Sequence, residues 1–323
     1  MKEIIISENE AGQRFDKYLD KYFKDAPKSF IYKMLRKKNI TRNGKKAEGG
    51  EKLVAGDVIK MFLADDTIDK FRGNTEITTV KRHIELDIIY EDENIIVVNK
   101  PVGMLSQKSE PHDESLNEYI IDYLLSYGKV DKVTLRTFKP SICNRLDRNT
   151  SGIVLAGVSL KGLQTLSFML KDRSLQKYYY CIVDGVMRES QKIDGYLRKS
   201  ESDNHVEIRE KMFDDASYIE TYYEPVKDNG RITLLKVKLI TGKTHQIRAH
   251  LAWIGHGIIG DYKYGNSKVN NYFNKKYGCR SQLLHAGEVV FPDVEGELSY
   301  LSGMNLKAGF TKMFYDILKG EFE

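Results

Sequence analysis

The chain has 323 residues, of which 41% are hydrophobic and 30% are charged, and its net charge at pH 7 is +5. No apolar run approaches the roughly 18 residues that a membrane span needs, and the N-terminus has the pattern of neither a signal peptide nor a transit peptide. Cys143, Cys181 and Cys279 are odd in number and lack CxxC pairing, which argues against a disulfide framework and a zinc site. We therefore expect a cytoplasmic protein with no membrane span and no metal site.

The first 63 residues have the pattern of a compact α/β unit. Apolar residues at helical spacing predict an amphipathic helix over 13–24. A second helix is expected from Ser29, which could cap it, to about Lys38. The Asn43-Gly44 pair then predicts a hairpin turn, and 58–63 has the pattern of a strand.

The excess positive charge lies in this first unit. Residues 1–63 carry 15 Lys/Arg and 9 Asp/Glu, or 15 − 9 = +6, which leaves 5 − 6 = −1 for the rest of the chain. Within it, residues 26–47 carry eight basic side chains and no acid, among them Arg36, Lys37 and Lys38. Such a pattern is typical of nucleic-acid binding, because basic side chains that neutralise phosphates release counterions. The alternative is a merely solvated charged helix.

Residues 64–82 are polar and without a clear period, so we expect a linker there. The third region, 83–323, mixes strand and helix patterns without regular βαβ alternation. Strands are expected within 84–100 and over 153–156, 177–185 and 231–240, and helices over 114–127, 159–170 and 244–255. This order favours an α+β fold with a mixed, largely antiparallel sheet.

Residues 141–157 place one acid, Asp147, between Arg145 and Arg148, just before an apolar run at 153–156. The pattern predicts a polar turn that feeds a buried strand and holds the acid at the edge of a core. Because the arginines would favour its charged form, Asp147 is a candidate nucleophile or base rather than a proton donor. A structural aspartate that accepts hydrogen bonds within the turn is an equal alternative.

Residues 241–251 include a second candidate, Arg248. A helix that starts near Thr244 would place Arg248 beside apolar residues, where an unpaired guanidinium is costly, so an acidic partner is expected. His245 and His250 are five residues apart and lack the HExxH spacing, so satisfied core histidines are favoured over metal ligands.

In the strand over 176–185, Lys177 and Tyr179 should face one side of the sheet, and Tyr178 and Tyr180 the other. A tyrosine stripe usually packs in a core, although a lysine beside Tyr179 also fits a polar site. Residues 260–265 and 283–292 look like ordered structural elements. Finally, the absence of a P-loop, a Rossmann glycine pattern and a G-x-S-x-G argues against an NTPase, a dehydrogenase and a serine hydrolase.

Five segments in order give the chain a resemblance to the RluA-type pseudouridine synthases of the large-subunit ribosomal RNA type. They are NKPVGM (99–104), NRLDRNTSG (144–152), KYYYCIVDG (177–185), TGKTHQIRAHL (241–251) with IIGDYKYG (258–265), and LLHA (283–286). Residues 1–63 separately resemble the alpha-L RNA-binding domain of the ribosomal protein S-four type. The resemblance implies three parts: an RNA-binding domain (1–63), a linker (64–82) and a pseudouridine synthase catalytic domain (83–323).

The resemblance also implies roles for individual residues. Asp147 would be the catalytic acid residue, Arg248 its ion-pair partner, and Tyr179 would lie against the uracil ring. Arg145 would fill the gap left by a flipped-out nucleotide, and Ile247 and Leu284 would line the base pocket. Arg36, Lys37 and Lys38 would contact RNA. The isomerisation that this family catalyses needs no cofactor and no metal, because uracil is detached, rotated and rejoined within one pocket.

The implied partner is structured RNA, most of all the large-subunit (23S) ribosomal RNA, bound by a monomer that does not associate with membranes. The polar segments 196–216 and 266–280 are candidates for RNA-contacting loops. Two other functions remain open: a catalytically idle RNA-binding or ribosome-assembly factor, and a hydrolase with Asp147 as its nucleophile. The presence of Asp147, Tyr179 and Arg248 together argues against the first. The lack of a second paired acid or metal cluster in the quoted segments weakens the other.

Overall fold

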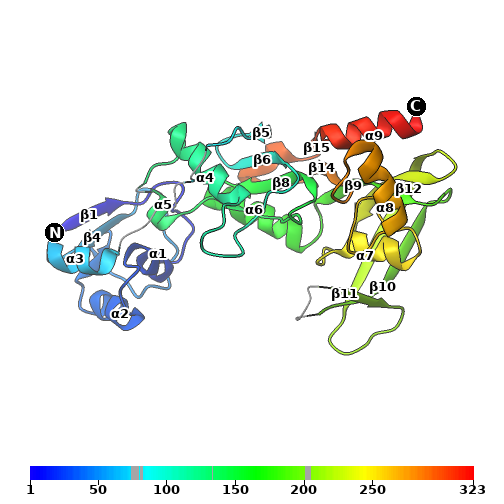
Figure 1. Cartoon of the computed structure of the whole chain (residues 1–323). Helices are drawn as coiled ribbons and strands as arrows, with labels where there is room; N and C mark the ends of the chain where they lie inside the picture. Colours follow the sequence, from blue (N-terminus) through cyan, green and yellow to red (C-terminus); the bar gives the residue numbers. More distant parts are fainter. Residues whose placement is uncertain (74–79, 81–82, 133, 201–204) are drawn as a thin grey trace.

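The computed structural model describes residues 1–73, 80, 83–132, 134–200 and 205–323. The molecule is elongated, with the N-terminal unit at one end and the C-terminal helix at the other (Figure 1). The two parts touch where the hydroxyl of Thr137 donates a 2.5 Å hydrogen bond to the Glu10 carboxylate. Among the described residues, no helix is both long enough and apolar enough to span a membrane.

The N-terminal unit is a small four-stranded sheet, in the order β1-β4-β2-β3, packed against helices. Its elements are β1 (Lys2–Ile5), α1 (Phe15–Tyr22), α2 (Lys28–Arg36), β2 (Ile40–Arg42), β3 (Lys45–Lys46), β4 (Val58–Met61) and α3 (Asp65–Arg72). Phe15 and Leu19 of α1 are fully buried and pack in one cluster with Ile31 of α2. The two predicted amphipathic helices are confirmed, as is the turn at Asn43-Gly44, where both residues have positive φ.

Two local expectations in this part of the chain are wrong. Helix α2 begins at Lys28 after Pro27, and no side chain caps it, so Ser29 is inside the helix rather than at its start. The expected linker at 64–82 begins with helix α3, whose buried Ile68 packs into the N-terminal core. The sequence did not predict this helix, because its few apolar residues lie among polar ones. Residues 74–79 and 81–82 of that segment lie outside the described part of the chain.

The larger part is built on an extended, strongly curved sheet with the strand order β11-β10-β12-β13-β9-β14-β8-β6-β5, to which β15 and β7 add at β14 and β8. Of the pairings in this sheet, β14 with β8 is parallel and the others are antiparallel. The predicted α+β fold with a mixed, largely antiparallel sheet is therefore confirmed. The strands are β5 (Ile88–Glu91), β6 (Ile95–Lys100), β7 (Ser141–Ile142), β8 (Ser151–Gly157), β9 (Gln176–Asp184), β10 (Gln191–Lys199), β11 (Val206–Arg209), β12 (Ser217–Asp228), β13 (Ile232–Leu239), β14 (Leu284–Val290) and β15 (Asn305–Lys307).

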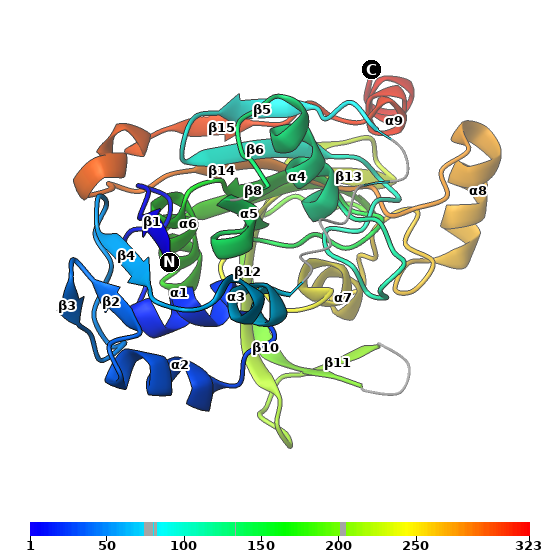
Figure 2. The ribbon, with the colours of Figure 1, turned by 90° about the vertical axis from the view of Figure 1, so that its left-hand side faces the viewer.

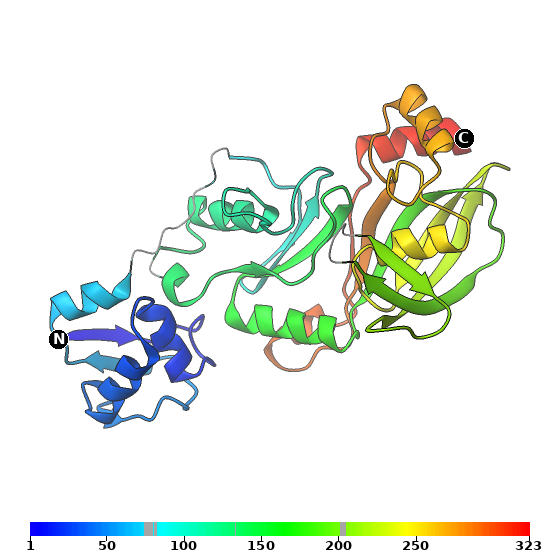
Figure 3. The same ribbon diagram turned by 60° about the horizontal axis from the view of Figure 1, so that its bottom comes forward.

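Helices cover both faces of this sheet, as Figures 2 and 3 show for α4 and α6 on opposite sides of β6 and β8. Accordingly, Val154 of β8 belongs to the core under α4, whereas the next residue, Leu155, belongs to the core against α6. Burial on both faces explains why these strands are continuous apolar runs in the sequence. The helices are α4 (Leu116–Ser126), α5 (Thr134–Thr137), α6 (Leu160–Lys171), α7 (Gln246–Trp253), α8 (Ser267–Tyr277), the 3-10 helix η1 (Gly296–Leu301) and α9 (Lys312–Phe322).

The two polar segments expected to be RNA-contacting loops contain regular structure. The first (196–216) includes the end of β10 and all of β11, which pair as a hairpin; its residues 201–204 lie outside the described chain. The second (266–280) is mostly α8, whose Phe273 is buried in a core shared with α9. It is therefore a packed helix rather than a loop, since Phe273 and Asn270 anchor one of its sides.

Gly152 allows strand β8 to lie very close to strand β14. Gly152 has φ +111°, and a Cβ at this position would lie 2.2 Å from the carbonyl oxygen of Ala286. Only glycine allows the start of β8 to approach β14 this closely at that backbone angle. The approach brings the loop that precedes β8 beside the start of β14, where Ser151 pairs with His285.

Candidate active site

Asp147 lies on the loop between β7 and β8, as the predicted polar turn before a buried strand requires. Ser106 holds this loop, because its hydroxyl donates to the carbonyl of Leu146 at 2.8 Å and accepts from the Leu146 amide at 3.0 Å. The amide of Thr150 donates to the Asp147 carbonyl at 3.0 Å, which closes the turn. The Asp147 side chain remains 30% exposed. The carboxylate therefore stands at the rim of the core, accessible to a substrate.

Arg248 of α7 has the acidic partner that its apolar surroundings required. Its Nη1 donates to Asp147 Oδ2 at 2.7 Å, across 101 residues of sequence. The arginine side chain is only 9% exposed. Its charge is therefore largely removed from water, and the ion pair is placed where screening by solvent is weak.

A second carboxylate, that of Asp261, holds Arg248 from the other side. Arg248 donates from Nε to Asp261 Oδ2 at 2.7 Å and from Nη2 to Oδ1 at 3.0 Å. Asp261 is 1% exposed and also accepts from the amides of Lys263 and Tyr264. Burial lowers the pKa of Arg248, but the bonds and charges of the two carboxylates more than offset this effect, so its pKa stays above the ordinary value. Sequence reasoning treated 260–265 as structural and missed Asp261.

His245 is the third group around Asp147, and it was expected to be only a core histidine. Its Nε2 lies 3.8 Å from Asp147 Oδ2, and its Nδ1 lies 2.9 Å from the hydroxyl of Tyr264. Burial lowers the pKa of His245 to about 4, with Arg248 and Lys263 acting in the same direction and Asp147 opposing. The imidazole is therefore neutral near pH 7. The ring of Tyr264 also faces the Arg248 guanidinium at 5.2 Å, which packs the cluster together.

Helix α7 starts two residues later than expected. It begins at Gln246, because His245 takes a left-handed backbone conformation with φ 54°. The Gln246 side chain points back toward the preceding loop, where its Oε1 accepts from the Thr241 hydroxyl at 2.9 Å and from the Lys243 amide at 3.1 Å. A left-handed conformation is uncommon outside glycine and is found disproportionately at functional sites. Here it aims the His245 ring at Asp147 while the helix carries Arg248 to the same carboxylate.

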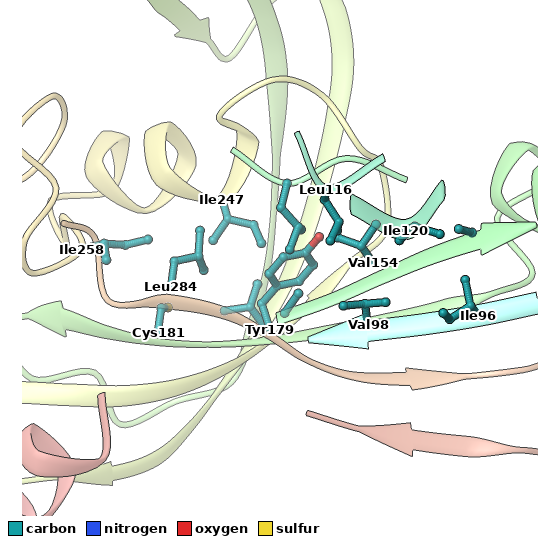
Figure 4. Close-up of a cluster of buried hydrophobic side chains, with 14 of the residues drawn as sticks. Ile96, Val98, Leu116, Ile120, Val154, Tyr179, Cys181, Ile247, Ile258 and Leu284 are labelled. Atoms are coloured by element: carbon teal, nitrogen blue, oxygen red, sulfur yellow. The ribbon is translucent and has the colours of Figure 1, made fainter. Parts of the chain in front are cut away.

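Tyr179 forms the floor of the site. It is 7% exposed and shares a hydrophobic cluster with Ile247 of α7 and Leu284 of β14, which lie near its ring in Figure 4. Burial, followed by the Asp147 charge, raises the pKa of the Tyr179 phenol, so it stays protonated at neutral pH. Lys177 lines the cleft together with Tyr179, as their spacing on β9 predicted.

These residues line one cleft of about 1000 Å³. It brings together Asp147, Tyr179, Arg248, Ile247, Leu284 and Arg145, the residues that the resemblance assigned to the reaction centre. Arg145 and Arg148 are both exposed at this cleft. The remaining three assigned residues, Arg36, Lys37 and Lys38, are exposed on and just after α2, in the N-terminal unit.

Lys100 is a further buried cation that sequence reasoning did not single out. It is fully buried, and its Nζ donates to three backbone carbonyls: Pro101 and Met104 at 2.9 Å and Arg148 at 3.1 Å. Burial lowers the pKa of Lys100 to about 8, and the Asp147 charge opposes this shift. Lys100 therefore ties the loop after β6 to the loop that carries Asp147. The sequence feature that could have indicated it is the position of Lys100 in NKPVGM, just after an apolar strand.

Among the described residues, no group of three or more His, Cys, Asp or Glu side chains is arranged to hold a metal ion. The carboxylates of the site are instead held by Arg248 and by backbone amides. What the arrangement offers is one accessible carboxylate, a fixed guanidinium, a neutral imidazole and a protonated phenol around a cleft with an apolar floor.

Comparison with known proteins agrees with this chemistry. The RNA pseudouridylate synthase family matches residues 94–253, which include Asp147, Tyr179 and Arg248. The ribosomal large subunit pseudouridine synthase C of Vibrio vulnificus is 32% identical over 297 residues, covering 89% of this chain and 87% of that protein. The protein of the same name from Vibrio cholerae is 30% identical over 322 residues, covering 96% of each.

The fold is also found among solved structures. Human RNA Pseudouridylate Synthase Domain Containing 4 superposes with a TM-score of 0.58 at 22% identity, covering 72% of this chain and 91% of that one. This likeness concerns the fold alone, whereas the sequence identities extend over nearly the whole chain. The chain therefore belongs to the RNA pseudouridylate synthase family, and it is an isomerase that forms pseudouridine in RNA.

Proposed function

We propose that this enzyme isomerises uridine in large-subunit (23S) ribosomal RNA, with Asp147 as the catalytic carboxylate and with the target nucleotide flipped into the cleft. The observation that carries this proposal is the pair of Arg248 and Asp147, at 2.7 Å, which lines the same cleft of about 1000 Å³ as Tyr179. The large-subunit substrate is supported by the names of the two Vibrio relatives.

The reaction breaks the C1′–N1 bond of uridine, rotates the uracil, and forms a C1′–C5 bond while a proton passes from C5 to N1. Atoms and electrons balance without any co-reactant, so the enzyme needs to supply only charge, position and proton transfer. Asp147 acts on the ribose as nucleophile or base, and Arg248 stabilises its negative charge. Arg248 also orients the Asp147 carboxylate, and Asp261 in turn holds Arg248 in place.

Tyr179 provides the surface for the uracil ring. Its ring lies among Ile247 and Leu284, so a planar base can pack on an apolar floor. Its phenol is protonated at neutral pH and can donate a hydrogen bond or pass a proton during the rearrangement.

Reaching the cleft requires the uridine to leave its helix, which costs a few kcal/mol. Arg145, exposed at the cleft, would fill the vacated space. The N-terminal unit (1–63) would add affinity through Arg36, Lys37 and Lys38, which are exposed and can contact phosphates.

Because one chain supplies every group named above, we propose that the enzyme acts as a monomer. It would work in the cytoplasm, where ribosomal RNA is made in bacteria.

The experiment is to map pseudouridines in total RNA from cells with the gene, without it, and without it but carrying the Asp147→Asn variant. We expect one or a few large-subunit positions to lose pseudouridine without the gene and to stay unmodified with Asp147→Asn. The matched control is Asp316→Asn on α9, an exposed aspartate far from the cleft, which should restore every position. Loss at transfer-RNA positions alone would overturn the ribosomal substrate, and full modification by Asp147→Asn would overturn the catalytic role.

A further inference from the structure

A second, smaller hollow of about 420 Å³ opens beside the cleft. We call it the side hollow and define it by residues 260–263 and 280–282. It shares Asn149, Arg248 and Gln282 with the main cleft, so the two spaces meet at the guanidinium that holds Asp147. A uridine in the cleft stays covalently linked to its neighbours, so one neighbouring nucleotide must lie next to the cleft wall.

The walls of the side hollow are fixed in place. Gly260 has φ +78°, and a Cβ there would lie 2.2 Å from the carbonyl oxygen of Ser281, so the two walls are in direct contact. Buried Asn270 of α8 holds the wall 260–263, accepting from the Gly260 amide at 2.7 Å and donating to the Asp261 carbonyl at 2.9 Å. The segment 266–280 thus supports this wall, in addition to packing against α9.

The wall 260–263 carries an aromatic side chain that is more than half exposed. Tyr262 is 56% exposed, and within the described chain it makes no hydrogen bond and no ring contact. It follows Asp261, which is locked by Arg248 and is 1% exposed. Unpaired bases stack on exposed aromatic side chains in RNA-binding proteins, and Tyr262 offers such a ring on a wall whose backbone is held beside Arg248.

The charges of the side hollow suit a phosphodiester. Arg248, Lys263 and Arg280 are its described Lys and Arg side chains, and its one described carboxylate, Asp261, is occupied by Arg248. Arg280 is exposed and has no ion pair with any described residue. An arginine in this position can bind a phosphate with two parallel hydrogen bonds.

We propose that the side hollow binds the nucleotide next to the target uridine, with its base stacked on Tyr262 and its phosphate held by Arg280. The proposal rests on the function proposed above and adds the residues that contact the sequence around the target. It assigns part of substrate selection to the wall 260–263 and 280–282, since a nucleotide that cannot stack on Tyr262 would be bound less tightly.

The test uses the full-length enzyme and a transcript that carries the mapped uridine, together with two copies made abasic one position before and one position after that uridine. Tyr262→Ala should raise KM on the intact transcript about tenfold, as the loss of one stacked base does, and leave kcat within about twofold. On one of the abasic transcripts the variant and the wild type should have equal KM. Tyr262→Phe should behave as wild type, because it keeps the ring.

The matched control for exposure is Tyr315→Ala on α9, since Tyr315 is 58% exposed and lines neither hollow. For charge, Arg280→Gln should lower the salt slope of RNA binding by about 0.7–0.9, while Lys319→Gln on α9 should leave it unchanged. The proposal is overturned if Tyr262→Ala matches Tyr315→Ala, or if its loss is the same on all three transcripts.

A readout without turnover separates this proposal from the proposed function. With 4-thiouridine one position before or after the target, ultraviolet crosslinks should map to the peptide that contains Tyr262. Crosslinks that map elsewhere while the wild type forms pseudouridine would overturn the side hollow and leave the function standing. Crosslinks to Tyr262 without pseudouridine formation in the transcript would support the hollow and contradict the proposed substrate.

Discussion

Arg248 bonds Asp147 through a single nitrogen, Nη1, because its Nε and Nη2 are both held by Asp261. The two carboxylates thus have different positions relative to solvent: Asp261 is 1% exposed, whereas the Asp147 side chain is 30% exposed. A guanidinium clamped on its buried side presents one fixed donor to the accessible carboxylate. This asymmetry decides what each substitution should do.

Asp147→Asn should abolish turnover while RNA binding persists. Asparagine keeps the shape of the side chain but provides neither the nucleophile nor the base, so kcat should fall by roughly 10³-fold or more. Pseudouridine formation per folded molecule and gel-shift affinity are the two measurements. Retained turnover would identify Asp147 as a structural turn residue.

The same variant should lose only modest stability. Because Asp261 keeps Arg248 paired, the loss is that of one hydrogen bond to a charged group, about 1.5–3 kcal/mol of unfolding free energy, rather than that of an isolated buried charge. Urea unfolding of Asp147→Asn beside Asp316→Asn measures it. A loss above about 5 kcal/mol would mean that Asp261 does not support Arg248 alone.

Asp261→Asn should be the more destabilising of the two substitutions. It leaves the buried guanidinium without its two-bond partner and should cost about 3–5 kcal/mol of unfolding free energy. In the folded fraction kcat should fall, because Asp261 positions the guanidinium that holds the catalytic carboxylate. Equal unfolding midpoints for Asp261→Asn and Asp147→Asn would contradict the asymmetry of the clamp.

Removing Arg36, Lys37 and Lys38 together, each as Gln, should weaken RNA binding and lower its salt dependence. Each lost phosphate contact reduces the slope of log K against log salt by about 0.7–0.9. Fluorescence anisotropy across a salt series provides the slope, and Lys319→Gln serves as the control outside the N-terminal unit. If the slope stays unchanged, α2 does not dock RNA.

Stability should decline as the solution is acidified from pH 6.5 toward pH 4. Burial lowers the pKa of each of three histidines, His245, His250 and His285, to about 4. The unfolded chain binds protons at these positions near pH 6.5, whereas the folded chain does not until about pH 4, so protons favour unfolding between these values. The stabilisation is therefore fully present above pH 6.5 and is lost as the pH falls.

Each of these histidines should contribute on the order of 1–2 kcal/mol to the difference in unfolding free energy between pH 7 and pH 5. His285→Gln should make the pH dependence shallower, even though it destabilises the protein at pH 7. Replacement of exposed His112 by Gln should leave the dependence as it is. Urea unfolding at several pH values measures both, and equal slopes for the two variants would contradict the burial argument.

Turnover should survive chelators. The reaction needs no redox step, and the described part of the site contains no group of three or more His, Cys, Asp or Glu side chains that could hold a metal ion. Pseudouridine formation should be unchanged after dialysis against EDTA, provided that the RNA is refolded in monovalent salt and its folding is checked separately. Loss of turnover with correctly folded RNA would require a metal site.

Local patterns in the sequence determined much of this protein. The amphipathic helices α1 and α2, the Asn43-Gly44 turn and the polar turn before β8 follow from spacing and turn chemistry that act within a few residues. The need of Arg248 for an acid could also be predicted, because an arginine among apolar neighbours is costly wherever its partner lies. The order of the quoted segments indicated the family before any geometry was known.

The tertiary structure alone decided how these residues meet. Asp147 lies 101 residues from Arg248, and Asp261 lies 13 residues beyond it, and only the folded sheet brings the two carboxylates to one guanidinium. The left-handed turn at His245 and the three carbonyls around Lys100 likewise depend on neighbouring elements. Residue spacing encodes which side of a helix or strand a side chain takes. Which residue it contacts there depends on how distant elements pack, because the free energy gained by burial depends on the packing of the whole core and not on any one local segment.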